Sequence, residues 1–289
     1  MPIIQQSELR KGKNRWIHHG FIAFLVIMLP IQLLPHTWMF FNMFKAPLEV
    51  IKLPPNILPE KFLWENIPAT FKKLNLWRNI WNTLILCGGT ILIQIPVSSL
   101  CAYGLSKLRL RGSNMLLLFF IGTMMISGEA TIIPLYIMMT NFPLTGWNLI
   151  NSFWALILPF SAWGWMVFLF KNFFDTLPSS LFEAAKIDGA GNLRIFLMIV
   201  APLSGPVFAI AILNTFNAVY NQFMMPLMML PSPDKWPMMV QIYSTQWGGG
   251  LSWNQVMVLL TVTSLPLLLI YVLCQRYVVE GIVMTGIKG

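Results

Sequence analysis

Few residues of this chain could do chemistry, and most of them lie in three places. Glu129 stands inside a long apolar stretch, an amide-rich run begins at Asn214, and the segment 183–189 starts with Glu-Ala-Ala. The sequence contains no GxxxxGK[ST] phosphate loop, no GxSxG nucleophile motif and no HExxH metal motif. The residues therefore favour binding or mechanical roles, and a membrane-embedded enzyme is the alternative from another class.

Glu129 is the acidic residue placed well inside an apolar stretch. A carboxylate in the middle of a membrane span costs about 2.5 to 3.5 kcal/mol unless it faces water or a partner. We expect Glu129 to line a translocation path, where its oxygens can accept hydrogen bonds from hydroxyl groups. A protonated or hydrogen-bonded contact between helices explains the same residue, so both interpretations stay open.

The amide-rich run combines donors, acceptors and an aromatic ring. Asn214, Asn217 and Asn221 recur at helical spacing, and Tyr220 and Gln222 stand beside them. Such groups suit a ligand with many hydroxyls. Hydrogen bonds between neighbouring helices would use the same residues. The run is therefore a candidate for the solute path, with a packing role as the alternative.

A short helix is predicted after Ser180. Ser180 and Glu183 have the Ser-x-x-Glu spacing of a capping box, in which each side chain satisfies a free backbone amide at the helix start. The helix should continue through Ile187 and end near Gly189, because glycine adopts the left-handed conformation that closes helices. Asn192 can then cap the next helix.

One side of this short helix is predicted to be low and smooth. Leu181, Ala184 and Ala185 share that side, and the two alanines would allow another protein to approach the helix axis closely. A helix that only lies on lipid headgroups is the alternative.

The composition places the chain in a membrane. Of its 289 residues, 56% are hydrophobic and 10% are charged, and the mean hydropathy is +0.68. The net charge of +9 comes from short basic clusters between apolar runs, which set topology and do not form a nucleic-acid surface. Cys87, Cys101 and Cys274 lie in apolar runs without metal or disulfide spacing. His18, His19 and His36 do not form a metal-binding set.

Six apolar stretches are long enough to cross about 30 Å of hydrocarbon. They are 17–41, 79–104, 115–139, 149–171, 197–220 and 254–279. The sequence therefore predicts an all-α polytopic membrane protein with six transmembrane helices and a cytoplasmic helical loop, organised as one domain over 1–289. Prolines within these stretches predict kinks. They are Pro30, Pro35, Pro96, Pro134, Pro159, Pro202, Pro206 and Pro266.

Basic residues predict the orientation of the spans. They are frequent in 1–16, in the loop near 105–114 and in 173–196, so these segments and the tail 280–289 should be cytoplasmic. The loops 141–148 and 221–253 carry one lysine between them and should be external. Segment 42–78 carries six basic residues but also three glutamates and five prolines, and is interpreted as an ordered external cap.

The polar segment has a longer pattern. The segment reads Glu183-Ala184-Ala185, three intervening residues, Gly189, nine intervening residues and Ile199-x-x-Pro202. This pattern resembles the EAA loop of membrane permease subunits of bacterial ABC importers. Ala201 stands where that pattern has Leu.

The resemblance extends over nearly the whole chain and is to MalG-type carbohydrate permeases. It is carried by Asn82-Thr83, Ala102-Tyr103-Gly104-Leu105, Arg109-Leu110-Arg111-Gly112, Ile133-Pro134-Leu135-Tyr136, Asn221-Gln222-Phe223 and the tail from Gln275-Arg276-Tyr277 to Gly289. The chain departs from that branch at Tyr220-Asn221-Gln222-Phe223, where Trp-Asn-Glu-Phe is usual, and at Ser127-Gly128-Glu129, where Pro-Gly and apolar residues are usual.

The resemblance implies a function. Glu183, Ala184, Ala185, Asp188 and Gly189 would form a coupling helix that inserts into a separate ATPase, with Gly286, Ile287, Lys288 and Gly289 as a second contact. The chain itself would be no enzyme and would bind no cofactor, since ATP and Mg²⁺ belong to the ATPase.

The same resemblance implies partners and a solute. The partners would be a second permease subunit, an ATPase homodimer or heterodimer, and an extracytoplasmic solute-binding protein in a bacterial cytoplasmic membrane. The solute would be a sugar or oligosaccharide, and glycerol phosphate or a peptide is the alternative.

Overall fold

The computed structural model describes residues 12–108, 110–143, 145–248 and 250–286. Regular structure in these residues is helical, and they contain no strand. The chain folds into two compact units, which are described separately. One contains the described residues of Met1–Asn75 and Gly248–Pro266, and the other contains those of Leu76–Trp247 and Leu267–Gly289. The prediction of a single domain over 1–289 stays a prediction.

The first unit consists of α1 (Gly12–Asn42), α2 (Pro47–Val50), α3 (Asn66–Leu74) and the first part of α15 (Trp253–Gly286). Its small core joins Met43 and Phe44 to Val258 of α15. The Asn66 side chain donates hydrogen bonds of 3.0 Å to the carbonyls of Met43 and Lys45. These contacts order segment 42–78.

Lysines also hold this segment together. Lys45 is 1% exposed and donates to the Asn56 carbonyl, and Lys73 donates to the Gly250 carbonyl over 2.5 Å. Burial lowers the pKa of Lys45, while the nearby Glu49 carboxylate opposes that shift. Lys52 pairs with Glu60 at 2.7 Å. Several of the basic residues in 42–78 therefore have specific partners within their own unit.

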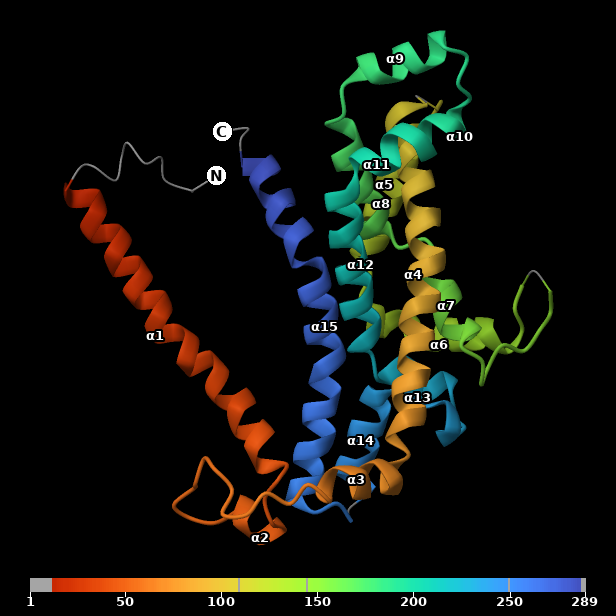
Figure 1. Cartoon of the computed structure of the whole chain (residues 1–289). Coiled ribbons are helices and arrows are strands. Elements are labelled where there is room, and N and C mark those ends of the chain that lie inside the picture. Colours follow the sequence, from red (N-terminus) through yellow and green to blue (C-terminus); the bar gives the residue numbers. More distant parts are fainter. Residues whose placement is uncertain (1–11, 109, 144, 249, 287–289) are drawn as a thin grey trace. The chain divides into compact units, whose positions relative to one another are not determined.

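The second unit is built around the long helix α4 (Leu76–Lys107). The elements that follow it are α5 (Ser113–Met124), α6 (Gly128–Thr140), α7 (Trp154–Phe160), α8 (Gly164–Asp175), α9 (Ser179–Ile187), α10 (Asn192–Ile195), a π-helical turn (Phe196–Val200), α11 (Ala201–Leu203), α12 (Gly205–Tyr220), α13 (Met224–Met229), a 3-10 turn (Pro233–Lys235) and α14 (Met238–Gly248). Helices α8 and α12 pack along α4, and α9 lies crosswise at one end of this bundle (Figure 1).

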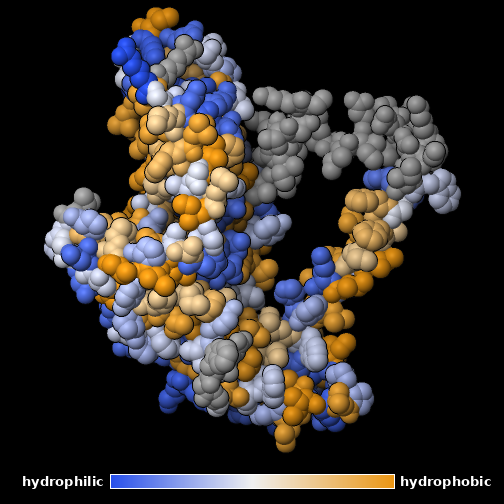
Figure 2. Space-filling view, turned by 180° about the vertical axis from the view of Figure 1, so that it is seen from behind, coloured by the Kyte–Doolittle hydropathy of each residue, from blue (hydrophilic) through white to orange (hydrophobic). Residues whose placement is uncertain are grey.

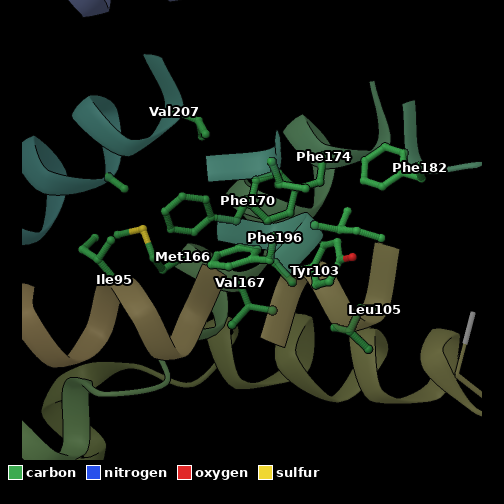
Figure 3. Close-up of a cluster of buried hydrophobic side chains, with 14 of the residues drawn as sticks. Ile95, Tyr103, Leu105, Met166, Val167, Phe170, Phe174, Phe182, Phe196 and Val207 are labelled. Atoms are coloured by element: carbon green, nitrogen blue, oxygen red, sulfur yellow. The ribbon is translucent and has the colours of Figure 1, made fainter. Parts of the chain in front are cut away.

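Aromatic side chains form the core beside α9. Phe170 and Phe174 of α8 pack against Phe196 and Tyr103, and the Tyr103 and Phe196 ring centroids are 5.4 Å apart (Figure 3). A second cluster at the other end of the bundle includes Leu86, Ile157 and Phe216. The two clusters bury the inner faces of α4, α8 and α12 and leave outer faces apolar and exposed, as a lipid-facing surface requires.

Three described helices are long and apolar enough to cross a membrane: His18–Asn42, Leu76–Lys107 and Trp253–Tyr277. They coincide with the stretches predicted at 17–41, 79–104 and 254–279. The other three stretches form bent helix pairs, α5 with α6 at 102°, α7 with α8 at 41°, and the segment Asn192–Leu203 with α12 at 82°. By length and composition the described residues thus contain three spans, or up to six if each bent pair is one.

Two predicted segments have a structure that the sequence did not indicate. Segment 221–253, predicted as an external loop, contains α13, the 3-10 turn and α14. The stretch 149–171 becomes helical only at Trp154, because Asn151 takes a left-handed backbone (φ 64°) in the preceding turns.

Candidate functional site

The polar segment forms the short helix α9, but its start differs from the prediction. The helix begins at Ser179 after Pro178, and no side chain caps it. Ser180 therefore lies inside the first turn, and the predicted capping box with Glu183 is wrong. Pro178 explains the shift, because its fixed φ of −58° and extended ψ of 133° complete the helix start one residue earlier.

The helix end confirms the expected role of Gly189. Gly189 has a φ of +76°, its amide donates to the Lys186 carbonyl over 3.0 Å, and the Ala190 amide donates to the Ala185 carbonyl over 2.9 Å. These two bonds form the Schellman motif, which requires a left-handed residue at this position. The expected cap at Asn192 is wrong, because Asn192 is the first residue of α10 and its side chain makes no cap bond.

The faces of α9 also differ from the prediction. Phe182 and Ala185 are each 8% exposed and belong to the aromatic core. Figure 3 shows Phe182 in this core, and the burial of Ala185 makes it unavailable to another protein. Leu181 is 40% exposed, Ile187 is 86% exposed, and Ala184 is exposed as well. The accessible apolar stripe therefore runs through Leu181, Ala184 and Ile187, which are spaced three residues apart.

Polar residues surround this stripe. Glu183 and Asp188 are exposed, and hydrophilic residues gather at the end of the second unit formed by α9 (Figure 2). The helix thus presents a narrow apolar strip flanked by carboxylates. Such a surface suits a protein groove better than an apolar lipid phase.

The base of α9 is clamped to the end of α4. The Ser106 hydroxyl donates to Asp175 over 2.6 Å, and Lys171 pairs with the other Asp175 oxygen at 2.6 Å. Lys107 donates to the Leu177 carbonyl over 3.0 Å and lies 4.8 Å from the centre of the Phe182 ring. A displacement of α9 would therefore pull directly on α4 and α8.

The C-terminal candidates fall at the edge of the described residues. Gly286 is the last residue of α15. Ile287, Lys288 and Gly289 lie outside the described residues, as do Met1 to Lys11 of the predicted cytoplasmic N-terminus.

An open cavity of about 690 Å³ lies at the helix breaks of the second unit. It is lined by the α5–α6 break, the α7–α8 break and the residues after α12. Polar members of its lining are Thr123, Glu129, Thr131, Asn221 and Gln222. Its volume is within the range of about 300 to 1,000 Å³ typical of small-molecule sites.

The cavity gathers some of the predicted path residues and not others. Glu129, Asn221 and Gln222 line it together. Asn214 bonds the Ile210 carbonyl of its own helix at 2.9 Å, and Asn217 accepts a 2.7 Å bond from Asn221. Neither lines the cavity.

Tyr220 does not line the cavity either. It is 2% exposed and stacks on Phe216, with ring centroids 5.5 Å apart. The structure thus gives Tyr220 a packing position.

Among the described residues that line the cavity, Glu129 is the one with a charged side chain. It lies in the first turn of α6, just after the 102° bend, and accepts a hydrogen bond from the Ser127 hydroxyl. The positive end of the helix dipole and this hydroxyl both favour the ionised carboxylate. Its exposure leaves oxygen lone pairs available to a ligand.

Sequence reasoning missed the threonines Thr123 and Thr131 and the residues around Trp163 as parts of the cavity. The signal was the pair of helix breaks at Met125–Ser127 and Ser161–Trp163, where polar and small residues interrupt apolar stretches. Threonines are common inside transmembrane helices, so their number alone does not indicate a cavity.

Comparison with known proteins completes this description. Residues 94–283 match the model of the family described as binding-protein-dependent transport system inner membrane component. The polygalacturonan/rhamnogalacturonan transport system permease protein YtcP of Bacillus subtilis (strain 168) is 32% identical, over 96% of this chain and 100% of that protein.

Two further similarities cover almost the whole chain. The sn-glycerol-3-phosphate transport system permease protein UgpE of Yersinia enterocolitica is 29% identical, over 96% of this chain and 98% of that protein. A solved bacterial ABC transporter involved in the import of the acidic polysaccharide alginate matches the fold with a TM-score of 0.78, at 20% identity, over 96% of this chain and 100% of that chain.

Proposed function

Because the chain belongs to the family of binding-protein-dependent transport system inner membrane components, we propose that it is a permease subunit that carries a sugar or oligosaccharide across the bacterial cytoplasmic membrane. The energy would come from a separate ATPase that binds ATP and Mg²⁺, since this chain lacks a phosphate loop. The chain would catalyse no bond change itself.

The observation that carries this proposal is the construction of α9. Its inner side is fixed by Phe182 and Ala185, its end is closed at Gly189, and Lys107 of α4 contacts both the Phe182 ring and the Leu177 carbonyl just before the helix. A helix held so firmly can transmit a push, while its exposed stripe at Ala184 is free to seat in a groove. Glu183 and Asp188 would fix the orientation of that contact.

The proposed assembly follows from the family. Six spans, with each bent pair crossing once, would place both termini and α9 in the cytoplasm. A second permease would complete the pathway, two ATPase subunits would receive the coupling helices, and an extracytoplasmic binding protein would deliver the solute. ATP binding would favour the outward-open pathway, and hydrolysis would reset it. Gly286, Ile287, Lys288 and Gly289 are proposed as a second ATPase contact.

The cavity favours a neutral sugar over an anion. Its described lining offers one carboxylate, two amides and two threonine hydroxyls but no basic group, and this set suits neutral hydroxyls. A phosphate or a uronic acid would meet the like charge of Glu129. Similarity to UgpE keeps glycerol phosphate as the second candidate. Its uptake would require cations from the partner permease.

Reconstitution with the second permease, the ATPase and the binding protein tests the proposal. ATP-dependent uptake into proteoliposomes should occur with a neutral oligosaccharide, and uronic-acid oligosaccharides and glycerol phosphate serve as competitors. Ala184→Asp should reduce both uptake and ATPase co-purification at least about tenfold, because it buries an unpaired charge at the contact. Ala69→Asp places the same charge on an exposed alanine of α3 and should have no such effect. Full ATPase binding by Ala184→Asp would refute the coupling role.

A further inference from the structure

Gln94 is a fully buried amide in the middle of α4, with an exposed fraction of 0%. Its Nε2 donates to the Phe160 carbonyl over 2.7 Å, and its Oε1 accepts a 2.5 Å hydrogen bond from the Thr215 hydroxyl. Both ends of the amide are therefore used, each with a different helix. Inside a membrane, where water offers no replacement, such bonds hold helices in a fixed register.

The bond to Phe160 fixes one wall of the cavity. Phe160 is the last residue of α7, so its carbonyl has no donor within its own helix. The chain then turns through Ser161–Trp163 into α8, and Phe160, Trp163 and Gly164 all line the cavity. Gln94 supplies the donor that the break requires, and thereby sets the position of this wall.

Close packing leaves this wall little freedom elsewhere. A Cβ on Gly164 would lie 2.3 Å from the Phe120 carbonyl oxygen, so α8 starts in direct contact with the backbone of α5. A shift of the break between α7 and α8 would therefore move two parts of the cavity wall, the end of α7 and the neighbouring part of α5.

The bond to Thr215 connects Gln94 to α12, the long helix that follows the proposed coupling loop 173–196. Helix α8 leads into α9, and α12 follows α9 through α10, the π-helical turn and α11. Thr215 of α12 is 1% exposed, and its hydroxyl bonds Gln94. One side chain of α4 thus joins α12 to the end of α7, next to the cavity and just before the break that leads into α8.

We infer that Gln94 is a positioning residue that transmits the displacement of α9 to the cavity wall. By holding the Phe160 carbonyl and Thr215 at once, it makes α4, the end of α7 and α12 move together when α9 is pushed. The inference rests on the proposed transport function and extends it to the path of the force. Without Gln94, ATP hydrolysis would continue while the cavity wall followed the motion incompletely.

The test compares buried polar groups of α4 and α12 in the reconstituted complex. Gln94→Leu and Thr215→Val each remove one side of the connection. Thr90→Val is the matched control, because Thr90 is also 0% exposed on α4 but its hydroxyl bonds the Leu86 carbonyl of the same helix, at 2.8 Å. Thr215→Ser keeps the hydroxyl and is the conservative variant.

The decisive quantity is the amount of solute transported per ATP hydrolysed. Gln94→Leu and Thr215→Val should lower this ratio about fivefold or more, because the lost interhelical bond is one that membrane interiors do not replace. ATP hydrolysis itself should persist. Thr90→Val and Thr215→Ser should keep the wild-type ratio. Thr215→Val is the milder change and serves if Gln94→Leu fails to assemble.

A second measurement needs no transport. Ala162→Cys places a thiol in the cavity wall, in a background where Cys87, Cys101 and Cys274 are alanine. A small maleimide should react with it faster in Gln94→Leu and Thr215→Val than in Thr90→Val. Equal labelling rates would overturn the inference. Faster labelling with an unchanged transport ratio would also overturn it, since Gln94 would then be merely structural. A wild-type complex that transports no solute would instead refute the proposed function itself.

Discussion

Glu129 shows how a single charged residue can be accommodated inside an apolar chain. Its carboxylate lies at the start of α6, where the helix dipole and the Ser127 hydroxyl stabilise the charge, and it faces an open cavity. Stabilisation by a helix terminus requires a helix that begins at Gly128. The 102° break before Gly128 is therefore part of what makes this carboxylate tolerable.

Replacing Glu129 tests its contact with solute. Glu129→Gln should raise the solute concentration needed for half-maximal uptake about five- to tenfold, because hydrogen bonds to a charged acceptor are stronger than those to a neutral one. Glu129→Ala should have a larger effect in the same direction. The measurement is the concentration dependence of uptake in proteoliposomes.

The control for this prediction is Glu65→Gln, which neutralises an exposed carboxylate outside the cavity. If Glu129→Gln and Glu65→Gln have the same uptake curve, Glu129 does not contact solute.

Residue types located the cavity only in part. Asn221 and Gln222 were predicted from their amide chemistry, and they line the cavity because they follow the last residue of α12, where side chains leave the helical register. Tyr220, Asn214 and Asn217 were predicted in the same way, but the helix directs them to the core, to the Ile210 carbonyl and to the Asn221 side chain. Which side of α12 faces the cavity depends on packing against α4, and the sequence does not contain that information in local form.

At the level of elements, the sharp corner after α9 depends on one glycine. Gly189→Ala should destabilise this corner by about 1 to 2 kcal/mol, because a φ of +76° brings an L side chain too close to the backbone. The expected result is less ATPase bound to the purified permease and a lower ratio of transport to hydrolysis.

Gly191→Ala is the matched control for that change. Gly191 has a φ of −69° and no atom within 4 Å of an added Cβ, so alanine fits there without strain. Similar losses in both variants would mean that the left-handed turn is not the cause.

Segment 42–78 offers a prediction about pH. The hydrogen bond and charge of Glu60 raise the pKa of Lys52, and Lys52 in turn lowers the pKa of Glu60. The pair thus contributes to stability at intermediate pH. This contribution is lost as pH falls through the lowered pKa of Glu60, and as pH rises through the raised pKa of Lys52.

Lysine acylation followed by peptide mapping measures this effect. Glu60→Gln should make Lys52 react faster near pH of about 9 to 10, because less of its amine would be protonated. Lys61 in the same sample is the internal reference, since the described structure gives it no ion pair. High salt should reduce the difference, because the pair is exposed. An unchanged rate at Lys52 would show that the pair does not form.

Helix breaks were the elements that sequence predicted least well. Pro30, Pro35, Pro96 and Pro266 all lie inside continuous helices, whereas α5 and α6 separate at residues 125–127, which contain no proline. Proline therefore identified the breaks only in part, since Pro159 precedes the break between α7 and α8, and Pro202 and Pro206 lie on either side of the break before α12. The separation of α5 from α6 depends on tertiary packing, as the contact of Gly164 with the Phe120 carbonyl shows.

At the scale of the molecule, length and hydropathy were sufficient to locate every apolar stretch but not its path. Helices α1, α4 and α15 are each long and apolar enough to cross, whereas each bent pair can either cross the membrane or return to the side it came from. The six apolar stretches of the sequence predict six crossings. The distribution of basic residues agrees with this topology except in segment 42–78, which is basic although it is predicted to be external. In that segment Lys45 and Lys73 bond specific backbone carbonyls.

Cysteine accessibility in intact cells resolves the crossings. In the background without Cys87, Cys101 and Cys274, a membrane-impermeant maleimide should label Lys61→Cys and Thr145→Cys, but should label Lys186→Cys only after permeabilisation. Lys61 and Lys186 alone do not decide the matter. Between them the chain crosses three times if both bent pairs cross and once if both return, and either count places them on opposite sides.

Thr145 separates these cases because it follows α6 and precedes α7. If α5 and α6 together cross the membrane, Thr145 lies on the same side as Lys61. If the 102° bend makes them a re-entrant loop, Thr145 lies on the side opposite to Lys61. Protection of Thr145→Cys in intact cells, with Lys61→Cys labelled, would therefore contradict six spans.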